Sequence, residues 1–255
     1  MKIIQRLSGV VFLLALLVAW ETIARLGLVT PDQLPAPSAI AHAMATEILQ
    51  GDLAIEFLRT TRRLVIGYGI AVILGTLAGF ALGRWRLLYA ASEPIIEFFR
   101  PLPVIAVLPV AVLLLGLGDA MAYSVIAFGS GWVVLLHAMD AVRGIDPVLI
   151  DTGRTFQASG FRQFSTIILP AAAPQTFTGL RVALGNAVIV TVVVELVSGF
   201  GGGLGGYIGE EQGALRTPEA YAGIILVAVL GYGIGRLFGV FEGSMLRWHR
   251  QMMGR

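Results

Sequence analysis

The feature that most constrains this chain is a series of six long apolar stretches that contain few charges. They lie at roughly residues 7–29, 64–83, 93–117, 119–142, 176–199 and 221–243. A helix needs about 20 mostly apolar residues to cross the ~30 Å hydrocarbon layer of a bilayer. We therefore predict an all-α membrane protein with six transmembrane helices.

The composition excludes a soluble globule and several classes of function. Charged residues make up 13% of the 255 residues and hydrophobic residues 56%, whereas an ordinary soluble domain is about 25% charged. The net charge of +2 is too small for a nucleic-acid-binding surface. There is no cysteine, and the three histidines are scattered along the chain, so we expect no metal site, no catalytic residue and no nucleic-acid partner.

The stretches divide the chain into segments of one transmembrane domain, residues 1–255. We predict an N-terminal span within residues 1–33, an external surface helix within 34–63 with Ser38 as its N-cap, and a core over 64–255. The core contains an inner loop, residues 143–175, which is the most polar part of the chain. The first stretch follows Lys2 and Arg6, but it is too long for a signal peptide, so we interpret it as a retained span.

The basic residues orient the spans, because loops on the cytoplasmic side carry an excess of lysine and arginine. With the N-terminus inside, thirteen basic residues fall on the inner side and five on the outer side. The inner ones are Lys2, Arg6, Arg84, Arg86, Arg100, Arg143, Arg154, Arg162, Arg181, Arg236, Arg247, Arg250 and Arg255; the outer ones are Arg25, Arg59, Arg62, Arg63 and Arg216. This distribution predicts that both termini are cytoplasmic, although the cluster Arg59, Arg62 and Arg63 runs against it.

Small residues recur at every fourth position in two of the stretches, which is typical of closely packed membrane helices. The second stretch carries Gly67, Ala71, Gly75, Gly79 and Gly83, and the sixth carries Gly231, Gly235, Gly239 and Gly243. We interpret both as helix packing, although the same pattern also suits a contact between subunits. The glycine-rich run 199–206 contains G-x-G-x-x-G, but it follows a membrane span, so we predict a loop there rather than a nucleotide site.

The inner loop carries a recognisable pattern. From Asp146 it reads DPVLIDTGRTFQASGFRQFSTIILPAAAP. This resembles the cytoplasmic loop of the permeases of ATP-binding-cassette (ABC) importers, E-A-A, three residues, Gly, nine residues, I-x-L-P. Asp151, Thr152 and Gly153 stand at the E-A-A positions, and Leu169-Pro170 ends the pattern. Gln157 replaces the usual glycine, and Gly160 is a candidate to serve the turn in its place.

Further matches extend this resemblance from about residue 34 to residue 181. They are similar to the nitrate, sulfonate and taurine branch of these permeases. The matching segments are Leu34-Pro35-Ala36-Pro37-Ser38-Ala39-Ile40, Arg100-Pro101-Leu102-Pro103, Leu108-Pro109, Gly116-Leu117-Gly118-Asp119 and Val142-Arg143-Gly144-Ile145-Asp146-Pro147.

The resemblance implies a type I importer permease with a short coupling helix between spans 4 and 5, in a bacterial inner membrane. Two copies of the chain, a homodimer, would sit on two ATPase subunits, which hold the ATP and magnesium, so this chain would bind no cofactor. A binding protein outside would deliver a small, anionic solute to segments 30–63 and 200–220. The implied ATPase-coupling residues are Asp151, Thr152, Gly153, Arg154, Phe156, Gln157, Ala158, Ser159 and Gly160.

Polar residues and prolines inside the spans are candidates for the solute pathway, because such groups are costly in lipid. We select Glu195 and Asn186 in the fifth stretch and Pro101 and Pro103 in the third. Glu195 suits either the pathway or a structural carboxylate. Near the end of the first stretch, Glu21 and Arg25 are spaced to pair with each other.

Two other classes of membrane protein stay open at this point. A secondary transporter would normally show two related halves, and none is visible. An intramembrane hydrolase could use Ser130 with His137, but these residues are seven positions apart on one helix and have no evident orienting group.

Overall fold

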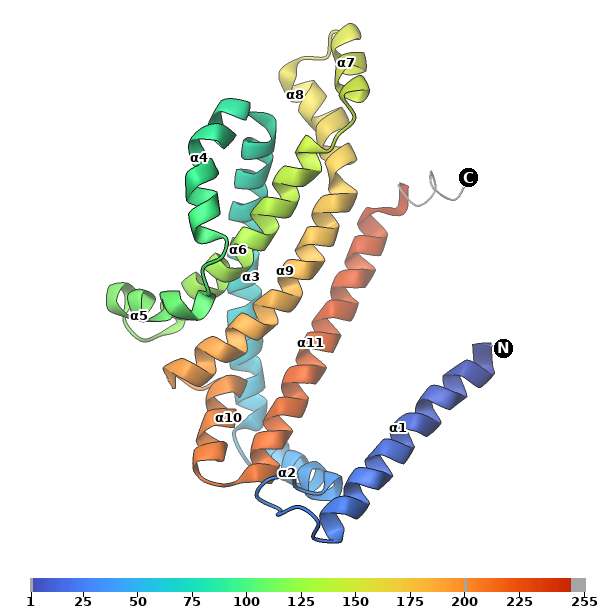
Figure 1. Ribbon diagram of the computed structural model, residues 1–255, viewed down its shortest axis with the longest axis vertical. Coiled ribbons are helices and arrows are strands. Elements are labelled where there is room, and N and C mark those ends of the chain that lie inside the picture. The colour runs from blue at the N-terminus through green and yellow to red at the C-terminus, as the bar shows by residue number, and fades with distance from the viewer. Residues whose placement is uncertain (1, 200, 249–255) are drawn as a thin grey trace. The chain divides into compact units, whose positions relative to one another are not determined.

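A computed structural model describes residues 2–199 and 201–248, and every regular element in these ranges is a helix (Figure 1). The elements are α1 (Lys2–Arg25), α2 (Pro37–Leu49), α3 (Leu53–Arg84), α4 (Arg86–Phe99), α5 (Val104–Leu115), α6 (Asp119–Arg143), α7 (Pro147–Thr155), α8 (Gly160–Gln163), the π-helix η1 (Phe164–Ile168), α9 (Leu169–Ser198), α10 (Leu204–Gly213) and α11 (Thr217–Met245). Arg250 and Arg255, which entered the orientation count, lie outside the described residues, as do the side chains of Lys2 and Arg6.

The chain divides into two compact units. Unit 1 comprises residues 1–60 and 195–229, and unit 2 comprises residues 61–194 and 230–255. The divisions fall inside α3, α9 and α11. The single domain over residues 1–255 stays a prediction.

Four helical segments of the described residues are long and apolar enough to cross a membrane. They are α3, α6, the run Gly160–Ser198 that ends in α9, and α11. The pair α4 and α5 gives a fifth span if it is taken together, but the two helices are bent by 98°. The fold class is therefore confirmed as an all-helical protein with several apolar helices, whereas the count of six spans stays a prediction.

The predicted third span is not one continuous helix. The chain leaves the helical path between Phe99 and Val104, where Pro101 and Pro103 lie. Proline lacks an N–H and restricts the residue before it, so closely spaced prolines stop a helix. Pro109, by contrast, lies inside α5 without ending it.

In unit 2 the small residues of α3 pack directly against α6. A Cβ atom placed at Gly67, Gly75, Gly79 or Gly83 would lie 2.7–2.9 Å from a Cβ atom of α6. The α6 partners are Ile126, Val134, Ala138 and Val142, respectively. The constant offset along both helices means that α3 and α6 run parallel in register. The interpretation of this glycine stripe as helix packing within the chain is confirmed.

Helix α9 joins the same layer of unit 2 through hydrogen bonds to both helices. The Tyr68 hydroxyl donates to the Leu180 carbonyl of α9 over 2.8 Å, and the Asn186 side chain of α9 donates to the Gly129 carbonyl of α6 over 3.0 Å. The glycine stripe of α11 is packed less closely. A Cβ atom at Gly231 or Gly239 would lie 3.6–3.7 Å from a side-chain atom of α9, and one at Gly235 would meet nothing within 4 Å. The α11 stripe therefore faces α9 at ordinary contact distance, without the close approach of α3 to α6.

In unit 1 a hydrogen bond joins the end of α1 to the first turn of α2. The Glu21 carboxylate pairs with Arg25 at 2.6 Å, as predicted, and also accepts from the Ser38 hydroxyl at 2.7 Å. Ser38 is not the N-cap of α2, so that prediction is wrong. The N-cap is Ala36, because Pro37 takes the first helical position, where its missing N–H costs nothing.

Two boundaries in unit 1 differ from the sequence-based expectation. Helix α3 begins at Leu53, so residues 53–60 are helical and do not belong to a surface segment. The glycine-rich run does not stay a loop to its end, because α10 begins at Leu204. Gly199, Gly201, Gly202 and Gly203 all have positive φ, between 57° and 95°, and glycine adopts this backbone at little cost.

Candidate functional site

Two short, capped helices form the polar segment between α6 and α9, at one end of unit 2 (Figure 1). Asp146 begins α7 by accepting a hydrogen bond from the Val148 N–H over 2.9 Å, and Pro147 occupies the first helical position. Ser159 begins α8 by accepting from the Arg162 N–H over 3.4 Å. The sequence therefore specifies both helix starts locally, and we call residues 146–163 the α7–α8 segment.

Gln157 itself makes the turn between the two helices. Its φ is +53°, in the left-handed region, and the N–H groups of Gln157 and Ala158 donate to the Arg154 and Gly153 carbonyls at 2.9 and 3.0 Å. This is the Schellman arrangement that normally ends in glycine. Gly160 is instead the first residue of α8, so the expectation that it replaces the usual glycine is wrong. The left-handed residue must directly follow the helix cap at Phe156, and Gly160 comes too late.

A buried glutamine, which sequence reasoning missed, fastens α7 to α8. Gln163 is 4% exposed, and its side-chain amide donates to the Ile150 carbonyl over 2.9 Å. Ile150 and Phe164 in turn pack on a buried cluster at the ends of α3, α6 and α9. The segment is consequently anchored to three long helices of unit 2. The sequence contains one signal for this contact. Gln163 is the single amide residue in the otherwise apolar face that Ile150, Phe164 and Ile168 form.

The opposite surface of the α7–α8 segment is apolar and open. Phe156 is 80% exposed and Phe161 82% exposed, and Val148 and Leu149 of α7 are exposed as well. Asp151 forms an exposed ion pair with Arg154 at 2.9 Å. Two largely solvent-exposed phenylalanine side chains on an anchored segment are typical of a surface that a protein partner covers. The predicted coupling residues therefore lie together on one small structural element.

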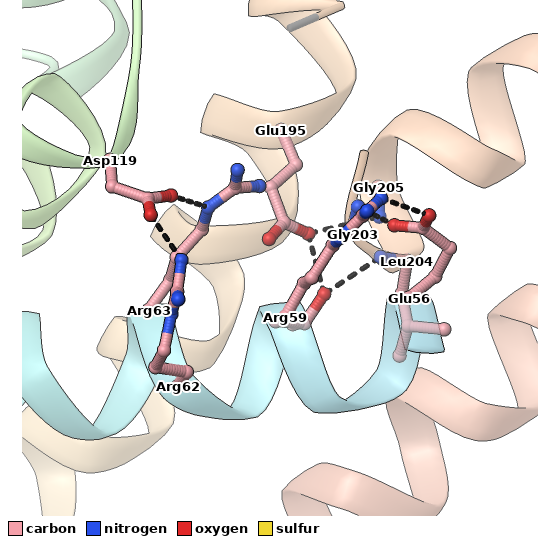
Figure 2. A network of polar contacts seen from close by, with 10 residues as sticks. Glu56, Arg59, Arg62, Arg63, Asp119, Glu195, Gly203, Leu204 and Gly205 are labelled. Carbon is pink, nitrogen blue, oxygen red and sulfur yellow. Dashed lines mark hydrogen bonds and ion pairs between the residues drawn. The ribbon is translucent and has the colours of Figure 1, made fainter. Parts of the chain in front are cut away.

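Unit 1 contains a buried polar network around Glu195 (Figure 2). Glu195 is 1% exposed, and its carboxylate accepts from the Thr60 hydroxyl at 2.8 Å and the Gly205 N–H at 3.1 Å. Thr60 accepts in turn from the Leu204 N–H at 2.7 Å, and Glu56 accepts from the Gly203 N–H. Two carboxylates and a hydroxyl thus satisfy the first N–H groups of α10, which a helix start leaves unpaired.

The far end of α10 is also held by a carboxylate. Glu211 is buried and binds the Arg216 guanidinium through two contacts, of 2.6 and 2.8 Å. Burial raises the pKa of the Glu211 carboxyl, while Arg216 acts in the opposite direction. Both ends of this short helix are therefore fixed by acidic side chains within unit 1.

A largely apolar cavity of about 340 Å³ lies beside the break between α4 and α5 in unit 2. It is lined by residues of α5 and α9, among them Val104, Leu108, Ile189 and Asn186. Pro103 is the N-cap residue of α5 and Pro101 precedes it in the break. Of the four predicted pathway residues, Asn186 lines this cavity, and Pro101 and Pro103 lie in the break just before its lining residue Val104. The role of all four in a pathway stays a prediction.

The arginines that ran against the orientation count are neutralised by acidic partners. Within unit 2, Arg62 and Arg63 both pair with Asp119, the latter at 2.9 Å (Figure 2). Within unit 1, Arg59 pairs with Glu56 at 2.5 Å. Paired arginines carry little free positive charge. The cluster therefore weighs little against the predicted orientation, which stays a prediction.

Ser130 and His137 do not form a nucleophile and base pair. The His137 Nδ1 atom bonds the Val133 carbonyl of its own helix at 2.8 Å, and its ring packs where a Cβ atom of Gly179 would lie. The Ser130 hydroxyl is fully buried and has no hydrogen-bond partner among the described residues. His137 therefore packs α6 against α9, and the geometry gives no support to a hydrolase.

Comparisons with known proteins agree on one family. Residues 71–247 match the family model described as "Binding-protein-dependent transport system inner membrane component". The chain is 30% identical to the "Putative aliphatic sulfonates transport permease protein SsuC" of Bacillus subtilis, over 97% of this chain and 90% of that protein. It is 27% identical to the taurine transport system permease protein TauC of Escherichia coli, over 94% and 89%, respectively.

A solved structure agrees with the fold. A chain of the MetNI methionine ABC transporter, in inward-facing conformations, superposes with a TM-score of 0.64 over 76% of this chain and 95% of that one. At 20% identity, this similarity concerns the fold alone.

Proposed function

The chain belongs to the family of inner-membrane components of binding-protein-dependent transport systems, and we propose that its α7–α8 segment docks onto the ATPase that drives transport. It is the permease subunit of an ABC importer, a transport subunit rather than an enzyme. Such a permease lies in the membrane with several spans and works with an ATPase and a substrate-binding protein.

The docking proposal depends mainly on one observation: the α7–α8 segment is firmly anchored on one surface and exposes apolar side chains on another. Gln163 and Ile150 fix the inner surface of the segment to the long helices. Phe156 and Phe161 face away from the protein, more than three-quarters exposed. Burying a phenylalanine in a partner's cleft is worth about 1.5–3 kcal/mol. A rigid element can then pass the ATPase's movement on to α6 and α9.

The cavity at the α4–α5 break supports a solute pathway in unit 2. Irregular backbone at membrane depth is tolerated where it lines a cavity or is buried in protein. We propose that Asn186 of α9 and the turn at Pro101 and Pro103 face the solute there. Glu195, whose carboxylate caps α10, serves the structure of unit 1 rather than the solute.

The assembly and its orientation complete the proposal. Two copies of the chain form a homodimer on two ATPase subunits, and ATP and magnesium bind to those ATPases rather than to this chain. Both termini and the α7–α8 segment lie on the cytoplasmic side, where Arg84, Arg86, Arg143, Arg154 and Arg162 also gather. The binding protein docks on the opposite side, at segments 30–63 and 200–220.

For the solute we propose a small anion of the sulfonate or taurine type. Two relatives that match nearly the whole chain carry aliphatic sulfonates and taurine in their names. Nitrate-like anions belong to the same branch. In such systems the external binding protein contributes much of the selectivity, so the permease alone does not fix the solute.

Uptake into proteoliposomes tests this function. The permease is reconstituted with the ATPase and the binding protein encoded beside it, and uptake of radiolabelled taurine and of an alkanesulfonate is followed with and without ATP. We expect uptake that needs ATP and stops when the catalytic carboxylate of the ATPase is replaced. Uptake by the permease alone, driven by an ion gradient, would instead establish a secondary transporter.

A further inference from the structure

A second cavity, distinct from the pathway and rich in arginine, lies beside the α7–α8 segment. It has a volume of about 450 Å³ and is formed where α3 passes into α4, where α6 ends and where α7 begins. Four arginines from these elements line it: Arg84, Arg86, Arg143 and Arg154. All of them belong to unit 2.

The positive charge of this cavity is largely uncompensated. Asp151 is the acidic residue of the lining, and it pairs with Arg154 at 2.9 Å. Among the described residues, no carboxylate forms an ion pair with Arg84, Arg86 or Arg143. The Arg143 guanidinium lies 3.6 Å from the centre of the Tyr89 ring, which orients it without neutralising it. Three like charges around one hollow repel each other, so a bound anion would relieve them.

The chemistry of the lining favours a phosphate group over a simple halide. The arginine fork matches the oxygens of phosphate and can bind two of them at once. The cavity has room for a whole phosphodiester headgroup. A single charged side chain of another protein would leave most of it unfilled.

The flanking residues favour a ligand that also has an apolar part. Trp85 lies between Arg84 and Arg86 in the sequence and is 60% exposed, and Leu87, which follows Arg86, is 85% exposed. Tryptophan gathers at membrane interfaces, and basic pockets at the cytoplasmic face of spans bind anionic lipid headgroups. We propose that this cavity binds the phosphodiester headgroup of an anionic phospholipid, with the acyl chains beside Trp85 and Leu87. That the lipid comes from the inner leaflet rests on the proposed orientation.

The site has a consequence for coupling, because α7 contributes to its wall. Arg154 and Asp151 line the cavity as well as pairing with each other. A phosphate in the cavity competes with Asp151 for Arg154 and links α7 to the junction of α3 and α4. Bound anionic lipid then favours the position of α7 in which it is linked to this junction. We therefore expect the transport rate to depend on lipid charge.

Native mass spectrometry of the detergent-purified chain tests lipid binding directly. The permease is titrated with phosphatidylglycerol and, separately, with phosphatidylcholine. The double variant Arg84→Gln/Arg86→Gln removes two unpaired charges, and Arg247→Gln is the matched control, an exposed arginine of unit 2 outside the cavity. Each basic residue near a membrane contributes a few-fold to the binding of anionic lipid, so we expect the double variant to bind phosphatidylglycerol about 30-fold more weakly. The control variant should bind it like the wild type.

Several outcomes would overturn the proposal. Equal phosphatidylglycerol binding by the double variant and the control would exclude this cavity as the site. Equal affinity for phosphatidylcholine would remove the role of charge. Displacement of the lipid by inorganic phosphate at matched ionic strength, with sulfate as the control salt, would mean that the cavity takes soluble phosphate. Copurification of the ATPase, measured on the same variants, separates this test from that of the proposed function. Loss of the ATPase without loss of lipid would assign the cavity to the ATPase interface instead.

Discussion

The side-chain amide of Gln163 donates a hydrogen bond to the backbone carbonyl of Ile150 over 2.9 Å, and this contact fixes the first short helix of the α7–α8 segment to the second. Both partners belong to the segment that carries the exposed phenylalanines, so the contact supports the surface that we assign to the ATPase. A buried hydrogen bond that loses one partner costs about 1–3 kcal/mol.

Replacing Gln163 by alanine should therefore loosen α7 without unfolding the membrane helices. We expect the amides of residues 147–155 to exchange with deuterium about 5- to 150-fold faster, because the local opening free energy falls by about 1–3 kcal/mol. Hydrogen–deuterium exchange with mass spectrometry measures this. Arg162→Ala, at the exposed neighbouring position, is the control and should leave the exchange unchanged. Unchanged exchange in Gln163→Ala would mean that the amide does not hold the segment.

Replacing Gln157 by glycine should stabilise the same segment. Its φ of +53° costs a non-glycine residue about 1 kcal/mol, and glycine removes that cost. We expect slower exchange across residues 153–158. Ala158→Gly, one position later and outside the left-handed region, should have the opposite effect. Faster exchange in Gln157→Gly would contradict this. It would show that the glutamine side chain stabilises the segment by more free energy than its left-handed backbone costs.

The parallel packing of α3 on α6 predicts a contrast between two glycines of one helix. A Cβ atom at Gly79 would lie 2.5 Å from the Leu135 carbonyl, whereas one at Gly69 would meet nothing within 4 Å. Gly79→Ala should lower stability by about 1–3 kcal/mol, because the helices must separate. Gly69→Ala should leave the protein as stable as the wild type or slightly more so. Thermal unfolding in detergent, followed by size-exclusion chromatography, compares the two, and equal stability would contradict the register.

The role of Glu195 can be separated from that of a pathway residue. Glu195→Ala leaves the Thr60 hydroxyl and the Gly205 N–H without their acceptor, at a cost of about 1–3 kcal/mol, and should make α10 more accessible to protease. Glu195→Gln keeps a carbonyl oxygen there and should restore most of the stability and the transport. Loss of transport in Glu195→Gln at normal stability would instead place a required charge in the solute pathway.

The sequence was sufficient where local chemistry decides the structure. The apolar stretches predicted α3, α6, α9 and α11, the small residues at every fourth position of α3 predicted its contact with α6, and Asp146-Pro147 marks the start of α7. The predicted coupling residues all lie in the α7–α8 segment, and their role stays a prediction. These features depend on residues close together in the chain.

The remaining features depend on partners far apart in the sequence. Glu56 and Thr60 form hydrogen bonds with the start of α10, which lies more than 140 residues further along the chain. The residues next to Glu56 in the sequence therefore do not predict this network. The start of α3 was misplaced because the charges of Arg59, Arg62 and Arg63 resemble a loop until their partners Glu56 and Asp119 are known. Gly160 is a candidate for the turn by residue type alone, whereas the position of the helix cap at Phe156 requires the left-handed residue at Gln157.

The affinity of the partner ATPase for the permease in detergent tests the central claim most directly. The double variant Phe156→Ser/Phe161→Ser removes the two exposed phenylalanine side chains of the α7–α8 segment. Phe98→Ser, at an exposed phenylalanine of α4, is the control. Since each buried phenylalanine contributes about 1.5–3 kcal/mol, we predict an affinity at least about 100-fold lower for the double variant and an unchanged affinity for the control. An unchanged affinity in the double variant would contradict the assignment of this segment to the ATPase.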